Sequence, residues 1–379
     1  MTDHPLPAPG ETTGWITPPT DGGERLDGRS TVLVTADRLI TGRRGEAPGT
    51  LEVIGDVPAV GPDGEGAGPA EDARRAGRGG AVLLDRKRIL FAGTAAEAEA
   101  HLAHPSSRAD LAVTVPERIV RLDLPGSTLM PGLIETHDHL PTSGTAVEYP
   151  DYGAHEVARL TLNAARSARE LLSVGVTSAQ SLGARHYVDV AVRDAVDNGD
   201  VRGPRIIASG PQITTTGGHS YHAGAEVDSL EQIRHEVRHH HKMGVDTIKV
   251  MATGGFMTGG SAPWFAQFGQ DELEVLFAEA HRLGRWTAAH AHGTQGIERA
   301  VRAGVDFVAH ASFVTAHGRS EFDAALADEM ARAGVYVECT ITADMPQMLR
   351  RDESYAPPAR QLWEHGVRIV AGHDAGIPA

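Results

Sequence analysis

From residue 129 onward the chain alternates between two kinds of segment, and this alternation constrains the fold more than any other feature. Eight short apolar runs are separated by longer stretches with helical amphipathic periodicity. Such alternation is typical of βα units around a parallel sheet. The first run lies in the stretch 129–140, and the others cover 174–181, 205–209, 246–252, 286–291, 306–310, 335–340 and 367–372.

Amphipathic stretches between these runs predict helices. They cover 156–172, 230–243, 271–283, 293–303, 321–333 and 359–364. Eight strands alternating with helices over about 250 residues is what a (β/α)8 barrel, or TIM barrel, requires. A doubly wound sheet is the alternative, because a sequence does not show whether a sheet closes. The fold class is therefore α/β, with a barrel predicted over residues 129–379.

The part of the chain before the barrel predicts a smaller domain. Residues 1–29 mix Pro, Gly and charge without periodicity, which predicts a disordered lead. Between residues 30 and 128 lie short strand-like runs, which predict a small β domain. These runs cover 31–36, 81–85, 89–93 and 118–122, and a flexible insertion rich in Gly, Ala, Glu and Arg is predicted over 61–80.

Composition excludes several kinds of partner. The formal charge of -15 argues against nucleic acid or an anionic membrane, because both require clustered Lys and Arg. Cys339 is the only cysteine, so no intrachain disulfide forms and thiolate is not the main source of metal ligands. No apolar run is long enough to span a bilayer, and the N-terminus has no apolar signal region. The expectation is a cytoplasmic protein with a small-molecule substrate, and homo-oligomerisation stays open.

Two histidines separated by one residue end the first strand. Side chains alternate across a strand, so His137 and His139 point to one side while Asp138 points away. Two neutral imidazoles on one face can bind one metal ion. A single His-x-His motif of this kind is weak evidence for a metal site.

Other metal-binding residue types occur at the ends of further strands, where a barrel carries its catalytic groups. Each alone has another reading: His310 as a core histidine, Asp374 as a helix cap. A lysine inside an apolar strand is costly to bury unpaired, so Lys249 needs a partner, a lowered pKa or chemical modification. Their joint occurrence predicts a metal centre. The set comprises Lys249 in the fourth strand, His290 and His292 at the end of the fifth, His310 at the end of the sixth, and Asp374 after the eighth.

Two further histidine-rich stretches have different interpretations. The loop 216–222 follows the third strand, and its His219 and Tyr221 are candidates for contacting substrate. The run His239, His240 and His241 belongs to a polar helix and is interpreted as a solvated face without function.

The motifs together resemble the amidohydrolase superfamily, and within it the imidazolonepropionase-like branch that includes metal-dependent Xaa-Pro dipeptidases. The stretches that carry the resemblance are 130–134 with the His-x-His pair, 248–255, 290–293 and 374–376. Glu135 and His373 depart from the pattern, since relatives usually have Asp and Thr or Ser there. Relatives also continue beyond the eighth strand with a helix and returning strands, so the end at Ala379 predicts a C-terminally truncated barrel.

The resemblance implies a small N-terminal β-sandwich beside the barrel and a site for one or two metals. Imidazole and carboxylate ligands favour zinc, with manganese, iron or cobalt as alternatives. The second metal would take His290 and His310, and carbamylated Lys249 would bridge the two ions. His292 would act in catalysis, and His219 and Tyr221 would contact substrate. The more buried metal would take His137, His139 and Asp374.

The predicted activity is metal-dependent hydrolysis of an amide C–N bond in a small peptide-like, N-acyl or cyclic amide substrate. A water bridging two cations has a pKa near neutrality, and Asp374 can accept its proton and pass it to the leaving nitrogen. The alternatives are an Xaa-Pro dipeptidase, a lactone or cyclic-amidine hydrolase, and an inactive truncated barrel.

Overall fold

The computed structural model divides the chain into two compact units, Met1–Pro131 and Gly132–Ala379, which are described separately. It describes residues 31–44, 51–55, 79–85, 88–103, 119–142, 153–342, 345–351 and 356–377. The predicted lead 1–29 and most of the predicted insertion 61–80 lie outside these residues.

The second unit contains two sheets whose strands all run parallel. Its strands confirm the eight predicted ones, and β9 and β10 are two short additions. The smaller sheet has the order β6 (Leu133–Asp138), β7 (Val176–Ser181), β8 (Arg205–Ala208). The larger has the order β10 (Ala225–Glu226), β9 (Ile213–Thr214), β11 (Thr247–Met251), β12 (Trp286–Gly293), β13 (Phe307–Val314), β14 (Tyr336–Glu338), β15 (Arg368–Val370).

Backbone hydrogen bonds connect the two sheets in two places. The N–H of Asp246, just before β11, donates to the carbonyl of Ala208 in β8 over 2.8 Å. The N–H of Thr136 in β6 donates to the carbonyl of Ala371, just after β15, over 3.2 Å. Because all strands are parallel, these links gather their carboxyl ends at one end of the unit.

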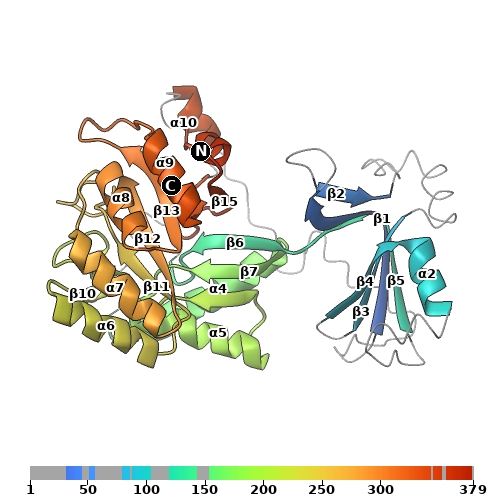
Figure 1. Ribbon diagram of the computed structural model, residues 1–379. Helices are drawn as coiled ribbons and strands as arrows, with labels where there is room; N and C mark the ends of the chain where they lie inside the picture. Colours follow the sequence, from blue (N-terminus) through green and yellow to red (C-terminus); the bar gives the residue numbers. More distant parts are fainter. Residues whose placement is uncertain are drawn as a thin grey trace. The chain divides into compact units, whose positions relative to one another are not determined.

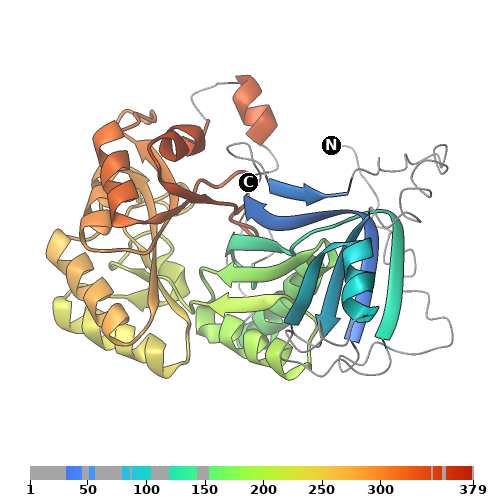
Figure 2. The same ribbon diagram turned by 45° about the vertical axis from the view of Figure 1, so that its right-hand side comes forward.

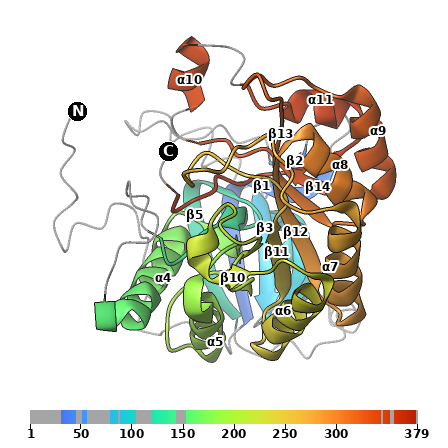
Figure 3. The same cartoon turned by 90° about the vertical axis from the view of Figure 1, so that its left-hand side faces the viewer.

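Amphipathic helices pack against the strands and close the main core. In α7 (Gln270–Arg282), apolar residues at positions 273, 276, 277 and 280 are fully buried, which is helical spacing. Burying one such Leu or Phe contributes about 1.5–3 kcal/mol. In Figure 1, α7 lies between α6 and α8, and Figure 3 shows these three helices beside β11 and β12. The helices are α4 (Glu156–Ser173), α5 (Val188–Asn198), α6 (Leu230–Lys242), α7, α8 (Thr294–Arg302), α9 (Ala324–Ala333), α10 (Met345–Arg351) and α11 (Ala359–Glu364).

In the second unit, two helices and the burial of one histidine differ from the sequence prediction. Neither α5 nor α10 was predicted, and the valine-rich sequence of α5 has the residue type of a strand, which hides its helical period. The helices α4 and α5, in green in Figure 2, pack together beside the smaller sheet. The interpretation of residues 239–241 as a solvated face was wrong for His240. This side chain is fully buried, and its Nε2 lies 2.9 Å from the carbonyl oxygen of Pro211.

The first unit holds one sheet with a helix on it. The long β1 (Thr31–Arg44) pairs antiparallel with β2 (Leu51–Ile54) and β3 (Gly80–Asp85), and parallel with β5 (Ile119–Leu129). β4 (Arg88–Thr94) pairs with β3, and α2 (Ala95–Ala103) buries Ala98 and Leu102 in the core of this unit. β2 and α2 were not predicted. The described residues contain no second sheet here, so the sandwich stays a prediction.

Candidate metal centre

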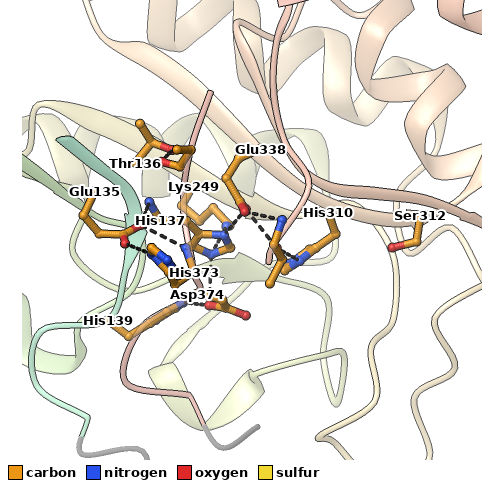
Figure 4. Close-up of polar contacts among 12 residues, drawn as sticks. Glu135, Thr136, His137, His139, Lys249, His310, Ser312, Glu338, His373 and Asp374 are labelled. Atoms are coloured by element: carbon orange, nitrogen blue, oxygen red, sulfur yellow. Dashed lines mark hydrogen bonds and ion pairs between the residues drawn. The ribbon is translucent and has the colours of Figure 1, made fainter. Parts of the chain in front are cut away.

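The end of β6 and the segment after β15 bring three predicted ligands together. The backbone N–H of His139 donates to the carbonyl of Ala375, and the N–H of Ala375 donates to the carbonyl of His137. As a result, Oδ1 of Asp374 lies 3.1 Å from Nε2 of His137 and 3.1 Å from Nε2 of His139. We call these residues the first ligand group; Figure 4 shows them converging.

The first ligand group fits a cation. Oδ1 of Asp374 is buried and has no hydrogen-bond partner among the described residues. Burial acts to raise the pKa of this carboxyl, but His137 and His139 beside it outweigh burial and hold the pKa below its usual range. An ionised oxygen facing two imidazole nitrogens without a hydrogen bond is the donor set that a divalent metal binds.

A second ligand group comes from β12 and β13, which pair with each other in the larger sheet. His290 and His292 on β12 and His310 on β13 offer one nitrogen each within 4.8 Å of one another. In each of these rings, the other nitrogen has an oxygen atom within hydrogen-bond distance. His290 Nε2 lies 3.0 Å from the Gly254 carbonyl oxygen, and His292 Nδ1 lies 2.9 Å from the Ser312 hydroxyl. His310 Nδ1 lies 2.7 Å from the hydroxyl of Thr340.

Burial keeps these three rings neutral. It lowers the pKa of His292 to about 3 and moves the pKa values of His290 and His310 well below their usual range. Neutral imidazole is the form that binds a metal. The two ligand groups adjoin each other, since the ring centroids of His137 and His310 are 5.1 Å apart.

Lys249 lies in β11 beside the first ligand group. Its side chain is 1% exposed, and its Nζ lies 3.4 Å from Nε2 of His137. Burial lowers the pKa of the amine to about 8, although the carboxylates of Asp374 and Glu338 oppose the change. About a tenth of the amine is therefore neutral and nucleophilic at pH 7, far more than of an ordinary lysine.

Glu338, at the end of β14, is a member of the site that the sequence analysis missed. Its side chain is fully buried, and its Oε2 accepts a hydrogen bond from Nδ1 of His137 over 2.8 Å. The signal was present, because a carboxylate at the end of the seventh strand follows the rule that selected the other ligands. It was overlooked because the resemblance assigned no role to that strand.

Glu135 and His373, both of which depart from the family pattern, contact each other. Glu135 Oε2 lies 2.5 Å from Nδ1 of His373. Glu135 Oε1 accepts from the backbone N–H groups of His137 and His373, over 3.0 Å and 3.1 Å. Glu135 therefore ties the strand that carries His137 to the segment that carries Asp374.

Strained backbone occurs at one ligand within β13 and just after β14 and β15. His310, Thr340 and Asp374 have φ values of 71°, 51° and 54°, in the left-handed region that non-glycine residues rarely adopt. Each such residue costs about 1–3 kcal/mol and persists where its surroundings hold it in place.

The two residues predicted to contact substrate differ in their position relative to the cavity. His219 lines the cavity, its ring centroid lies 4.7 Å from that of His290, and burial lowers its pKa to about 4. Tyr221 is 39% exposed, its ring centroid lies 4.0 Å from that of His222, and it is not among the described residues that line the cavity. The structure brings His219 to the metal centre and leaves Tyr221 outside it.

The ligand groups lie in a cavity of about 780 Å³. Apart from the ligands and a few hydroxyl and amide groups, its walls are apolar, and Lys249 is the only Lys or Arg among the described lining residues. The apolar lining comprises Met251, Phe256, Met257, Val314, Cys339, Met345, Ala356, Pro357, Pro358 and Ile377.

The parallel α/β unit carries two adjoining groups of imidazole and carboxylate donors at or near the ends of its strands. This combination is typical of metal-binding α/β proteins. Comparison with known families makes this specific. The model of the amidohydrolase family matches residues 128–379, and the chain belongs to this family.

Among characterised proteins, ochratoxinase from Aspergillus niger is 35% identical to this chain over 213 residues. The match covers 49% of this chain and 43% of ochratoxinase, so the chain matches less than half the length of this relative.

Solved structures share the fold. A Xaa-Pro dipeptidase with bound methionine superposes with a TM-score of 0.69 at 23% identity, covering 92% of this chain and 80% of the dipeptidase. The A. niger ochratoxinase structure gives a TM-score of 0.65 at 23% identity, covering 91% and 76%. Molinate hydrolase gives 0.65 at 19% identity, covering 91% and 73%. These likenesses show a mixed α/β fold common to Xaa-Pro dipeptidase-like amidohydrolases.

The helices offer no membrane-spanning segment: within the described ranges, none combines the length and apolar character needed to cross a bilayer.

Proposed function

We propose that this protein is a metal-dependent hydrolase that cleaves the amide C–N bond of a small, neutral and largely apolar molecule. The observation that carries the proposal is the first ligand group, whose buried Asp374 oxygen faces two histidine nitrogens and whose residues line a largely apolar cavity. Family membership and the likeness to ochratoxinase support the reaction class.

The scaffold we propose is a closed (β/α)8 barrel. Support comes from the eight parallel strands and from the two backbone links between the sheets, one joining β8 to the start of β11 and one joining β6 to the end of β15. Closure would hold ligands from distant parts of the chain at one rim, as in other barrels.

Two divalent cations, zinc by preference, would occupy the site. The first ligand group would hold one ion, and His290 and His310 would hold the other. The neutral amine of Lys249 can attack carbon dioxide, forming an N–C bond and releasing one proton, to give a carbamate whose two oxygens suit a bridging position. When bound, such cations polarise an amide carbonyl and lower the pKa of water.

The chain's own groups would handle the proton. Asp374 is ionised and lines the cavity, so the carboxylate oxygen that does not bind the cation can accept a proton from water and deliver it to the leaving nitrogen. The Ser312 hydroxyl can donate to Nδ1 of His292, which leaves a proton on Nε2 for the substrate's carbonyl oxygen. His219, also neutral, lies beside His290 and would contact the substrate.

The cavity wall favours a substrate without a free carboxylate. A buried carboxylate requires a charged or hydrogen-bonding partner, yet no arginine lines the described cavity, and Lys249 is committed to the metal centre. Phe256, Met257 and Met345 instead offer apolar contact.

The likeness to a Xaa-Pro dipeptidase supports a second candidate, cleavage of dipeptides. The test is a comparison of alanyl-proline with a neutral N-acyl anilide, using protein reconstituted with zinc and bicarbonate. We expect the anilide to give the higher kcat/KM and Asp374→Asn to abolish turnover. Faster cleavage of alanyl-proline would favour the dipeptidase, and no turnover of any amide would contradict hydrolysis.

A further inference from the structure

One buried carboxylate contacts both halves of the metal centre. Oε2 of Glu338 accepts from Nδ1 of His137 over 2.8 Å and from the hydroxyl of Thr340 over 2.9 Å. The backbone N–H of Thr340 donates to Oε1 of the same carboxylate. The Thr340 hydroxyl oxygen in turn lies 2.7 Å from Nδ1 of His310. In Figure 4, Glu338 lies between His137 and His310.

The direction of each hydrogen bond in this chain is fixed. A carboxylate only accepts, so Nδ1 of His137 must carry a proton. The Thr340 hydroxyl has one hydrogen, and it is donated to Glu338, so its oxygen accepts from Nδ1 of His310. In both rings Nδ1 therefore carries a proton, so Nε2 is the nitrogen that can serve as a metal ligand.

We propose that Glu338 is the positioning residue that sets the tautomer of one ligand in each group, directly for His137 and through Thr340 for His310. This inference rests on the metal centre of the proposed function and adds a coupling between its two halves. Glu338, His137 and His310 also offer ligand atoms within 4.8 Å of one another, but in this inference the Glu338 carboxylate accepts hydrogen bonds and is not a metal ligand. The strained backbone of Thr340, with φ at 51°, is explained by the need to place its hydroxyl between the carboxylate and His310.

The network predicts different outcomes for two isosteric changes. In Glu338→Gln, the amide oxygen faces the Thr340 backbone N–H, so the NH2 group occupies the place of Oε2 and donates to both partners. That reverses both bonds and moves the proton to Nε2 of His137 and His310. In Thr340→Val, the branched shape is kept, Glu338 loses one donor, and of the two rings only His310 loses its partner.

The experiment is a zinc titration against a chromogenic chelator for wild type and variants. Partners of metal-bound histidines typically contribute about 10- to 100-fold in metal affinity. We expect Glu338→Gln to weaken both sites by that factor, Thr340→Val to weaken one site only, and Thr340→Ser to restore it. Thr342→Val is the matched control, because the Thr342 hydroxyl is buried on the same segment without a hydrogen-bond partner in the described structure.

A second readout reports the tautomers directly. Long-range 1H–15N spectra of the metal-free, histidine-labelled protein should lose one Nδ1-protonated ring in Thr340→Val and two in Glu338→Gln. Unchanged spectra and affinities in folded variants would overturn the inference. So would a third bound zinc in wild type that Glu338→Gln alone removes, because Glu338 would then be a ligand. If wild type binds no zinc, the proposed function fails; if wild type binds two and the variants match it, only this inference fails.

Discussion

The two ligand groups are organised by different means. In the first, backbone bonds between β6 and the segment after β15 bring His137, His139 and Asp374 together, and neither Nδ1 of His139 nor Oδ1 of Asp374 has a hydrogen-bond partner among the described residues. In the second, each histidine ring is held from behind by its own oxygen partner. The first group therefore depends on a cation to satisfy it, whereas the second is oriented before any cation arrives.

The largest expected effect comes from the carboxylate of the first group. Asp374→Asn removes both a negative ligand and the proton acceptor, and general acid–base groups contribute about 10²–10⁴-fold to rate. We expect kcat/KM for the anilide to fall by about 10³-fold or more and one zinc per chain to be lost. Steady-state kinetics and elemental analysis check this, and a variant that keeps both metals and its rate would refute the role of Asp374.

Substitution of Lys249 should weaken zinc binding at both ligand groups. Lys249→Ala removes the proposed bridge, so the loss in zinc affinity should exceed the about 10- to 100-fold effect of an outer partner. Wild type should need bicarbonate for full reconstitution, whereas Lys249→Glu, which supplies its own carboxylate, should not. Reconstitution of wild type to full activity without any carbon dioxide would contradict the carbamate.

The pair formed by Glu135 and His373 should act on the first group alone. Glu135→Gln weakens the link between β6 and the segment that carries Asp374. We expect about 10-fold weaker zinc binding at one site. The second site should be unchanged, and His373→Ala should add little to Glu135→Gln in a double-mutant cycle. Additive effects would show that the two side chains act independently.

The smallest effect on activity should come from Asp189, a buried carboxylate remote from the ligand groups. It accepts from the backbone N–H groups of Val190, Ser209 and Gly210, and burial raises its pKa to about 6. Because the folded pKa exceeds the unfolded value, the native state binds the extra proton. Stability should rise as pH falls from 7 towards 4, by up to about 3 kcal/mol from this group.

The check is urea unfolding of the metal-free protein across that pH range. Asp189→Asn should lack this component of the pH dependence and retain activity after reconstitution. Asp374 should behave in the opposite sense, because its pKa is held low and its contribution is lost on acidification. An identical pH dependence in wild type and Asp189→Asn would contradict the assignment.

The sequence predicted what local patterning determines. Buried parallel strands are apolar runs, so all eight were found, and His137, Lys249, His290 and His310 could be located at or near strand ends. The contacts of Glu338 and the pairing of Glu135 with His373 could not be predicted, because each depends on residues about 200 positions or more apart. The burial of His240 was missed for the same reason, since its partner lies in another segment.

The most direct test of the account is the zinc content of the monodisperse protein after reconstitution with zinc and bicarbonate. We predict two zinc ions per chain, and one in a variant that carries both His290→Ala and His310→Ala. Zinc-free wild-type protein, or a double variant that still holds two ions, would contradict a centre built from two ligand groups.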